Sequence, residues 1–389
     1  MSPDRDALIT GIGLISCLGQ GEDAHMAALD AFAPVVDSAK FAPYAVHPMT
    51  ALTLAAQIPK RGDQRQMEPW QQIGVYAAGL ALDEAKAKGD TALLERMDMI
   101  VAAGGGERDY AADSAILAAL PTAEDPERYL NEHLLTDIRP TLFLAQLSNL
   151  LAGNISIVHG VIGSSRTFMG EEAAGADALR IACARIQAGQ SDICLVGGSY
   201  NAQREDSLLH LAMGHMMRRG EYAPVWARQA DGGGAIAGSV GCFMVVESRA
   251  HAAKRGVAAK AKISGVLTDR CGRGPGQSAA IAAAQFAALG GKADAAISAA
   301  SGATGPTADE KQFLDGLGLP VRAVASAIGH SLEPSFPAAV ALAAMSIGRG
   351  KLFPPLDPAE QAFAGAPSRL LVTSWGMWRG EASALVQAA

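Results

Sequence analysis

The sequence predicts an α/β fold built of two halves that repeat one pattern. Short apolar runs of strand character alternate with longer Ala-rich stretches of helical character along the whole chain, which is typical of sheets covered by helices. The second half repeats this theme, and no low-complexity linker separates it from the first. We therefore expect one rigid core, with halves at residues 1–255 and 256–389 that join near Arg249–Lys260.

Each expected element follows from an apolar run or an Ala-rich stretch. Strands are predicted at Ala7–Gly11, Met99–Ala103, Arg166–Met169, Ile193–Gly198 and Cys242–Glu247 in the first half, and at Lys262–Leu267, Ala295–Ala300, Ala323–Ala327, Leu370–Ser374 and Ala382–Val386 in the second. Helices are predicted at Gln71–Lys88, Arg139–Leu151, Glu172–Ala188, Ser278–Leu289, Ala308–Gly316 and Ser335–Ile347. The segments Leu120–Asn131 and Asp231–Gly234 are predicted to be surface excursions.

Composition excludes several classes of function. The 389 residues are 49% hydrophobic, 18% charged and 5% aromatic, with a net charge of -7. Nucleic-acid binding needs clustered cations, so this balance argues against a nucleic-acid partner. No apolar run approaches the roughly 18 residues of a membrane span, and the N-terminus lacks the features of a signal peptide. We expect a cytoplasmic protein without membrane insertion.

The cysteines and histidines predict neither disulfides nor a metal site. Five cysteines, an odd number, are widely spaced, and no histidines stand at ligand spacing. Cys271 lies in a loop between Arg270 and Arg273, where cations lower a thiol pKa, but no base can be placed beside it. The glycines of Ile9–Ser16 do not complete a dinucleotide fingerprint, because Ser16 replaces the third glycine. We expect no cofactor.

Several motifs resemble the β-ketoacyl-ACP synthases over nearly the whole chain. They are Asn149–Gly163 with the following Gly170–Gly175, the opening Ile9–Gly19, the block Ser191–Ser199 and the run Gly241–Gly256. The resemblance implies the thiolase fold, in which duplicated halves form α-β-α-β-α layers. It also implies acyl chemistry on an acyl carrier protein, whose phosphopantetheine arm brings the acyl chain.

The resemblance places a glutamate where the family has its nucleophile. In the family a cysteine at the first turn of a helix carries the acyl chain as a thioester, and here that position is Glu172. A carboxylate cannot accept an acyl group by thioester exchange. Glu171 and Glu172 at a helix N-terminus are also simply favourable electrostatics. The functional alternatives are that Glu172 imitates an acylated centre or acts as an acid or base.

Two further catalytic elements of the family are degraded. Its His-Gly-Thr-x-Thr loop corresponds to Ser301–Gly305, so the histidine is Ser301 and the threonine positions are Ala303 and Gly305. Its Lys-x-x-x-Gly-His run corresponds to Ala325–His330, so the lysine is Ala325 while His330 remains. A lone histidine beside apolar residues is more often a core residue than a catalyst.

The C-terminal gating loop of the family is also altered. Its Phe-Gly-Phe-Gly-Gly sequence corresponds to the gate residues Trp375, Met377, Trp378 and Arg379, with Gly376 in second place. Two flexible glycines have become Trp378 and Arg379, and we expect their bulk to fill or fix the entrance.

These losses predict a ketosynthase homologue that does not condense by itself. The combination resembles the chain-length factors, which pair with an active ketosynthase and shape its acyl tunnel. Met97–Arg108 and Ser165–Glu172 look most like ketosynthase-like proteins of alphaproteobacterial clusters that make very-long-chain hydroxy fatty acids for lipid A. Two alternatives stay open. One is a self-standing acyl-ACP decarboxylase or hydrolase that uses Glu172, and the other is a homodimeric scaffold that binds acyl chains or the carrier protein.

Overall fold

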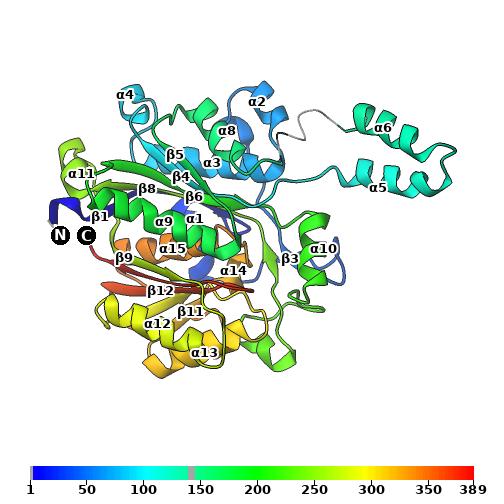
Figure 1. Ribbon diagram of the computed structural model, residues 1–389. Helices are drawn as coiled ribbons and strands as arrows, with labels where there is room; N and C mark the ends of the chain where they lie inside the picture. The colour runs from blue at the N-terminus through cyan, green and yellow to red at the C-terminus, as the bar shows by residue number, and fades with distance from the viewer. Residues whose placement is uncertain (1–2, 139–143, 145) are drawn as a thin grey trace.

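Two groups of five strands face each other across a pair of buried helices (Figure 1). The computed structural model describes residues 3–138, 144 and 146–389. The first group contains β1 (Ala7–Ser16), β4 (Asp98–Ala102), β5 (Ser165–Phe168), β6 (Ile193–Tyr200) and β8 (Val240–Ser248). The second contains β9 (Ala261–Asp269), β10 (Ala295–Ser298), β11 (Val321–Ala323), β12 (Arg369–Trp375) and β13 (Glu381–Gln387).

The two groups have the same pairing pattern. In the first, β5, β4 and β6 are parallel, and β8 and β1 then follow in antiparallel pairs. In the second, β11, β10 and β12 are parallel, and β13 and β9 follow in antiparallel pairs. An antiparallel pairing of Ala7–Ile9 with Ala261–Ile263 joins β1 to β9 and makes one continuous sheet. The structure therefore confirms the predicted duplication.

Helices complete five layers. The central helices are α9 (Glu171–Gln187) and α15 (Ser335–Gly348), which contact each other and strands of both groups. Outside the first group lie α3 (Pro69–Glu84) and α8 (Leu150–His159), and outside the second lie α12 (Gln277–Ala288) and α13 (Pro306–Leu317). Helix α15 is buried from Ser335 to Ile347, because its sequence is apolar on all sides. The α-β-α-β-α fold predicted from the sequence is confirmed.

Shorter helices and strands connect the elements of this core. They are α1 (Gly21–Asp30), α2 (Arg61–Gln66), α4 (Thr91–Leu94), α10 (Glu205–Met213), α11 (Arg249–Arg255) and α14 (Ala325–Ile328), with β2 (Gly19–Gln20), β3 (Val46–His47) and β7 (Ala237–Gly238). None of the helices within the described residues has the length and apolarity that crossing a bilayer requires. Helix α11 ends at Arg255 and β9 begins at Ala261, so we propose that the two halves join in this segment.

One predicted surface loop is largely helical. Helices α5 (Tyr110–Ala119) and α6 (Pro126–Thr136) form an arm that extends away from the layered core (Figure 1). The predicted loop Leu120–Asn131 therefore contains a 3-10 turn at Leu120–Thr122 and the start of α6. The Asp125 side chain accepts the Arg128 N–H, and Pro126 occupies the first helical turn. This capping sequence is a helix-start signal that the prediction missed.

Two other predicted elements differ from the structure within the described residues. The predicted strand Ala323–Ala327 is wrong, because β11 ends at Ala323 and α14 starts at Ala325. Periodicity alone cannot separate a short buried strand from a short buried helix. The predicted helix Arg139–Leu151 includes residues 139–143 and 145, which lie outside the described residues, and the helix that is described begins at Leu150.

The glycine-rich segment Asp231–Gly234 is only partly at the surface. Asp231 and Gly232 are exposed, whereas Gly233 and Gly234 are buried. The Gly234 N–H donates to the carbonyl of Gly302 at 2.7 Å. The expected excursion therefore packs against the loop that carries Ser301.

Candidate functional site

Loops that follow parallel strands converge beside the N-terminus of α9. The Glu172 segment follows β5, the Ser301 loop follows β10, and the gate residues lie at the last position of β12 and directly after it. The chain after β11 passes through α14 and reaches His330. Carboxyl ends of parallel strands meet at one edge of a sheet, which is the usual place for a site in α/β proteins.

A sharp turn brings Glu172 into the core. Gly170 has a φ of 123° and Glu171 a φ of 48°, so the backbone reverses between β5 and α9 in conformations that favour glycine. Strained backbone of this kind gathers at functional sites. Glu172 then lies in the first turn of α9 and is 3% exposed. The helix dipole favours a negative charge at this position.

The Glu172 carboxylate bridges two loops. Its Oε1 accepts hydrogen bonds from Nε2–H of His330 at 2.9 Å and from the backbone N–H of Met377 at 3.1 Å. His330 is itself buried, and its Nδ1 lies 3.4 Å from the Ser335 hydroxyl. The structure thus joins Glu172, His330 and the gating loop in one hydrogen-bonded group.

These contacts keep Glu172 ionised. Burial raises the pKa of the carboxyl, but the His330 hydrogen bond and charge, together with backbone N–H donors, outweigh burial and leave the pKa below its ordinary value. Among the described residues, Oε2 of Glu172 has no hydrogen-bond partner. It lies beside a cavity of about 10 Å³, also lined by Ser374 and Glu381, which is room for at most one water molecule. An acyl group does not fit there.

Ser301 and Ala325, at the other two substituted catalytic positions, make no hydrogen bond to the Glu172–His330 pair among the described residues. Ser301 is buried, and its hydroxyl accepts the Ala303 N–H at 3.1 Å. Within the described part of the chain it makes no hydrogen bond to Glu172 or His330. Ala325 packs in an apolar cluster with Val225 and Trp226. Neither position therefore supplies a proton donor or acceptor to Glu172.

The gating loop turns sharply and leaves no room for a side chain at Gly376. The Gly376 N–H donates to the Gly380 carbonyl at 2.8 Å, and a Cβ on Gly376 would lie 2.3 Å from the Arg379 carbonyl. Trp375 and Met377 are buried, whereas Trp378 is 36% exposed. The Arg379 guanidinium lies 3.5 Å from Oε2 of Glu171.

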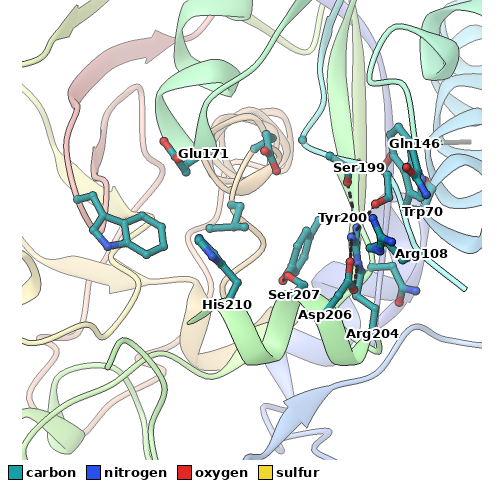
Figure 2. Close-up of a pocket in the computed structure, with 17 residues that line it drawn as sticks. Trp70, Arg108, Gln146, Glu171, Ser199, Tyr200, Arg204, Asp206, Ser207 and His210 are labelled. Carbon is teal, nitrogen blue, oxygen red and sulfur yellow. Dashed lines mark hydrogen bonds and ion pairs between the residues drawn. The ribbon is translucent and has the colours of Figure 1, made fainter. Parts of the chain in front are cut away.

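A cavity of about 410 Å³ opens beside the gate (Figure 2). Figure 2 shows His210, Tyr200 and Ser207 on one wall, with Glu171 across from them and the Arg204–Asp206 pair further along. Its full lining is Trp70, Gly104, Gly105, Gly106, Arg108, Gln146, Glu171, Ser199, Tyr200, Asn201, Arg204, Asp206, Ser207, His210, Leu332, Glu333 and Trp378. A second cavity of about 520 Å³ shares Glu171, His210 and Trp378 with it. The gate tryptophan Trp378 therefore lines both cavities.

Sequence reasoning did not identify this cavity or its buried carboxyl, Glu333. Glu333 is 4% exposed. Burial, helped by the charges of Glu172 and Glu171, raises its pKa to about 7, while its own backbone N–H and the charge of Arg204 act in the opposite direction. One signal was available: an acidic residue inside the apolar stretch 323–347 must either find a partner or serve a site.

Comparisons with known proteins decide the family. The profile of the Beta-ketoacyl synthase, N-terminal domain, matches residues 51–251. The chain belongs to the β-ketoacyl synthase family. No curated protein sequence matches it.

Solved structures show the same fold for this β-ketoacyl synthase family member. A Beta-ketoacyl synthase from Burkholderia phymatum STM815 has a TM-score of 0.79 at 18% identity, with 99% of each chain covered. The ishigamide ketosynthase/chain length factor has a TM-score of 0.80 at 20% identity, again with 99% of each chain covered. A type II PKS acyl-carrier protein in complex with its ketosynthase gives a TM-score of 0.77 at 16% identity, covering 99% of this chain and 100% of the other.

Proposed function

We propose that this chain is a non-condensing ketosynthase homologue that pairs with an active ketosynthase and shapes the acyl tunnel of the pair. One observation carries the proposal. At the position that corresponds to the nucleophile, Glu172 presents a buried carboxylate that is already bound by His330 and Met377. Thioester exchange needs a thiolate, so acyl transfer to this residue has no route.

The contact between Met377 and Glu172 also occupies a backbone N–H group that could otherwise stabilise a reacting oxygen. An N–H group aimed at a developing oxyanion lowers the barrier of acyl transfer. Here the Met377 N–H points at Oε1 of Glu172 instead. The carboxylate thus takes the place of a substrate oxygen, and the gating loop is held against α9 without substrate.

An exposed sheet edge supports pairing with another subunit. Among the described residues, strand β5 pairs with β4 alone and forms one end of the sheet, and Ser165 and Arg166 in it are exposed. Around it Ile157, Ile162 and Met169 are 68%, 60% and 64% exposed. A free strand edge beside exposed apolar side chains is a ready surface for a partner strand.

Similar solved structures suggest which proteins this chain would bind. One similar structure is that of a ketosynthase/chain length factor, and another contains an acyl-carrier protein with its ketosynthase. We propose an active ketosynthase as the partner at β5 and an acyl carrier protein as the donor of the acyl chain. A homodimer is the competing assembly. The assignment to very-long-chain or lipid A synthesis stays a prediction from sequence.

Co-expression followed by native mass spectrometry tests the pairing. We expect a heterodimer when the chain is produced with ketosynthases encoded beside its gene. The double variant Ile157→Asp with Ile162→Asp should abolish it, because two charges would be buried in an apolar interface. Val35→Asp is the matched control, since Val35 is also an exposed apolar residue, at 42%. A homodimer that persists in the presence of ketosynthases would favour the scaffold alternative.

The Glu172–His330 pair supports a second candidate function. A carboxylate and an imidazole 2.9 Å apart form an acid–base pair, as an acyl-ACP decarboxylase or hydrolase would require. Incubation of the purified chain with acyl-ACP or malonyl-ACP, with mass analysis of the carrier protein, distinguishes the two. Loss of the acyl group or of CO2 that stops in Glu172→Gln would establish the enzyme and displace the non-catalytic proposal.

A further inference from the structure

The 410 Å³ cavity beside Trp378 has the size of a ligand site. Its volume of about 410 Å³ falls in the range of small-molecule pockets. Its walls come from the N-terminus of α9, from α10, from the chain after β4 and from the gating loop. Figure 2 shows polar side chains pointing into it from several of these elements.

The arginines that line the cavity are already neutralised. Arg204 lies 2.5 Å from the Asp206 carboxylate and also donates to the carbonyls of Gly105 and Gly106 at 3.0 and 2.8 Å. Arg108 lies 2.6 Å from Asp113. Neither cation is left to attract a carboxylate or phosphate ligand.

The carboxylates of the same cavity are not neutralised. Within the described part of the chain, the Glu333 side chain has no ion-pair partner and no hydrogen bond to another residue, and its own backbone N–H is the hydrogen-bond donor that stabilises the carboxylate. It is nevertheless 4% exposed, and its Oε1 lies against Gly104, where a Cβ would come within 2.5 Å of it. Among the residues that the structure describes, the Glu171 carboxylate has one ion-pair contact, at 3.5 Å with the half-exposed Arg379. The uncompensated charge of the cavity is therefore negative.

We propose that this cavity binds an aliphatic ligand that ends in an ammonium group, held by Glu333 and Glu171 beneath the ring of Trp378. An ammonium group supplies the hydrogen-bond donors that a buried carboxylate lacks. The Trp378 ring lines the same space, and an indole face attracts a cation. The aliphatic part would extend along Leu332, which also lines the cavity.

Charged neighbours of Glu333 favour a cation over other ligands. Glu171 and Glu172 on α9 both raise the pKa of Glu333, and Arg204 before α10 lowers it. Asp206, Tyr200, Arg108 and His210 are the other titratable groups of the wall, and the His210 ring centroid lies 5.7 Å from that of Trp378. A cation beside Glu333 relieves the repulsion among the glutamates, whereas an anion would add to it.

Calorimetric titration of the purified full chain with three probes of equal length tests the proposal. The probes are n-octylamine, n-octanol and n-octanoate. We expect n-octylamine to bind about tenfold more tightly than n-octanol, because only the amine forms a charge-assisted hydrogen bond, and n-octanoate to bind most weakly. Equal binding of the amine and the alcohol would overturn the proposal.

The pH dependence separates a cation from a neutral ligand. Because the pKa of Glu333 is about 7, the site is ionised above that pH and protonated below it. Amine affinity should therefore rise about tenfold from pH 6 to pH 8, with release of one proton. A neutral ligand that accepts a hydrogen bond from the protonated carboxyl would show the opposite trend, and that outcome would also overturn the proposal.

Three variants test which residue is responsible for the preference for the amine and for its pH dependence. Glu333→Gln should remove both the preference for the amine and the pH dependence. Glu205→Gln is the control, because Glu205 is an exposed glutamate on α10 that does not line the cavity. His210→Asn should leave the pH dependence in place, and its loss in that variant would assign the titration to His210. Amine binding is measured on this chain without a partner subunit. Its outcome is therefore independent of whether the chain pairs with a ketosynthase.

Discussion

Oε1 of Glu172 lies 2.9 Å from Nε2 of His330, although 158 positions separate the two residues in the sequence. Both side chains are buried, at 3% and 2% exposure. The contact ties the first turn of α9 to the loop that precedes α15, the two central helices of the fold. The Met377 N–H adds the gating loop to the same oxygen. The position that would carry an acyl chain in a condensing enzyme therefore holds α9, the His330 loop and the gating loop together in this chain. We call this hydrogen-bonded group the Glu172 joint.

Substitution of Glu172 should show how much this joint stabilises the fold. We expect Glu172→Leu to lower the free energy of unfolding by about 3 kcal/mol, because the buried His330 and Met377 N–H lose their acceptor. Glu172→Gln keeps an acceptor oxygen and should cost about 1 kcal/mol. Urea unfolding of the three proteins measures the difference. Equal stability of the Leu variant and the parent chain would mean that the joint contributes nothing.

The stabilisation by Glu172 should depend on pH in the acid range. Its pKa in the folded protein is lowered, so the carboxylate contributes stability that is present above the pKa of an unfolded glutamate, about 4.3. That contribution is lost as pH falls through the lower folded-state pKa. The gap in unfolding free energy between the parent chain and Glu172→Gln should shrink as the pH falls below about pH 4. A gap that widens on acidification would contradict this assignment.

Restoring the nucleophile alone should not restore condensation. We expect Glu172→Cys to show no malonyl-dependent elongation, because Ser301 and Ala325 occupy the positions of the family's histidine and lysine. Residues that act as a unit in catalysis are not repaired one at a time. Product analysis by mass spectrometry, with an active ketosynthase as the positive control, provides the measurement. Elongation by the single variant would show that the remaining site is intact.

The gating loop should not tolerate a side chain at Gly376. A Cβ there would lie 2.3 Å from the Arg379 carbonyl and 2.9 Å from Oε2 of Glu172. We expect Gly376→Ala to lower the free energy of unfolding by about 1–3 kcal/mol, the range for overpacking. Gly316→Ala is the control, because nothing lies within 4 Å of a Cβ in that exposed helix position. That variant should be stabilised by about 0.4–1 kcal/mol. Thermal or urea unfolding of the pair tests the contrast.

The five thiols should differ in reactivity by their burial. Cys183, Cys194 and Cys242 are buried, and burial raises the pKa of each thiol. Cys17 is partly exposed, but burial raises its pKa to about 12. Cys271 is partly exposed in its loop, so iodoacetamide should label it first in the folded protein. Peptide mapping measures the order, and faster labelling of any buried cysteine would indicate local opening.

Predictions from the sequence succeeded where local pattern and burial coincide. The apolar runs at Ile193–Gly198 and Leu370–Ser374 became the buried strands β6 and β12, because a strand covered on both faces is apolar throughout. They failed at Ala323–Ala327, where one short apolar run is divided between β11 and α14. They also missed α6, because its capping residues lie in a polar segment that resembled a loop.

The sequence by itself determined the family, the five-layered fold and the absence of a thiol at position 172, because these depend on residue identity and on periodic burial. Only the tertiary structure decided what Glu172 does in that place. Its partners His330 and Met377 come from loops that follow other strands, and no local spacing relates them. The same holds for Glu333, whose burial raises its pKa to about 7. A desolvated carboxyl depends on every element packed around it, and that environment exists only in the folded chain.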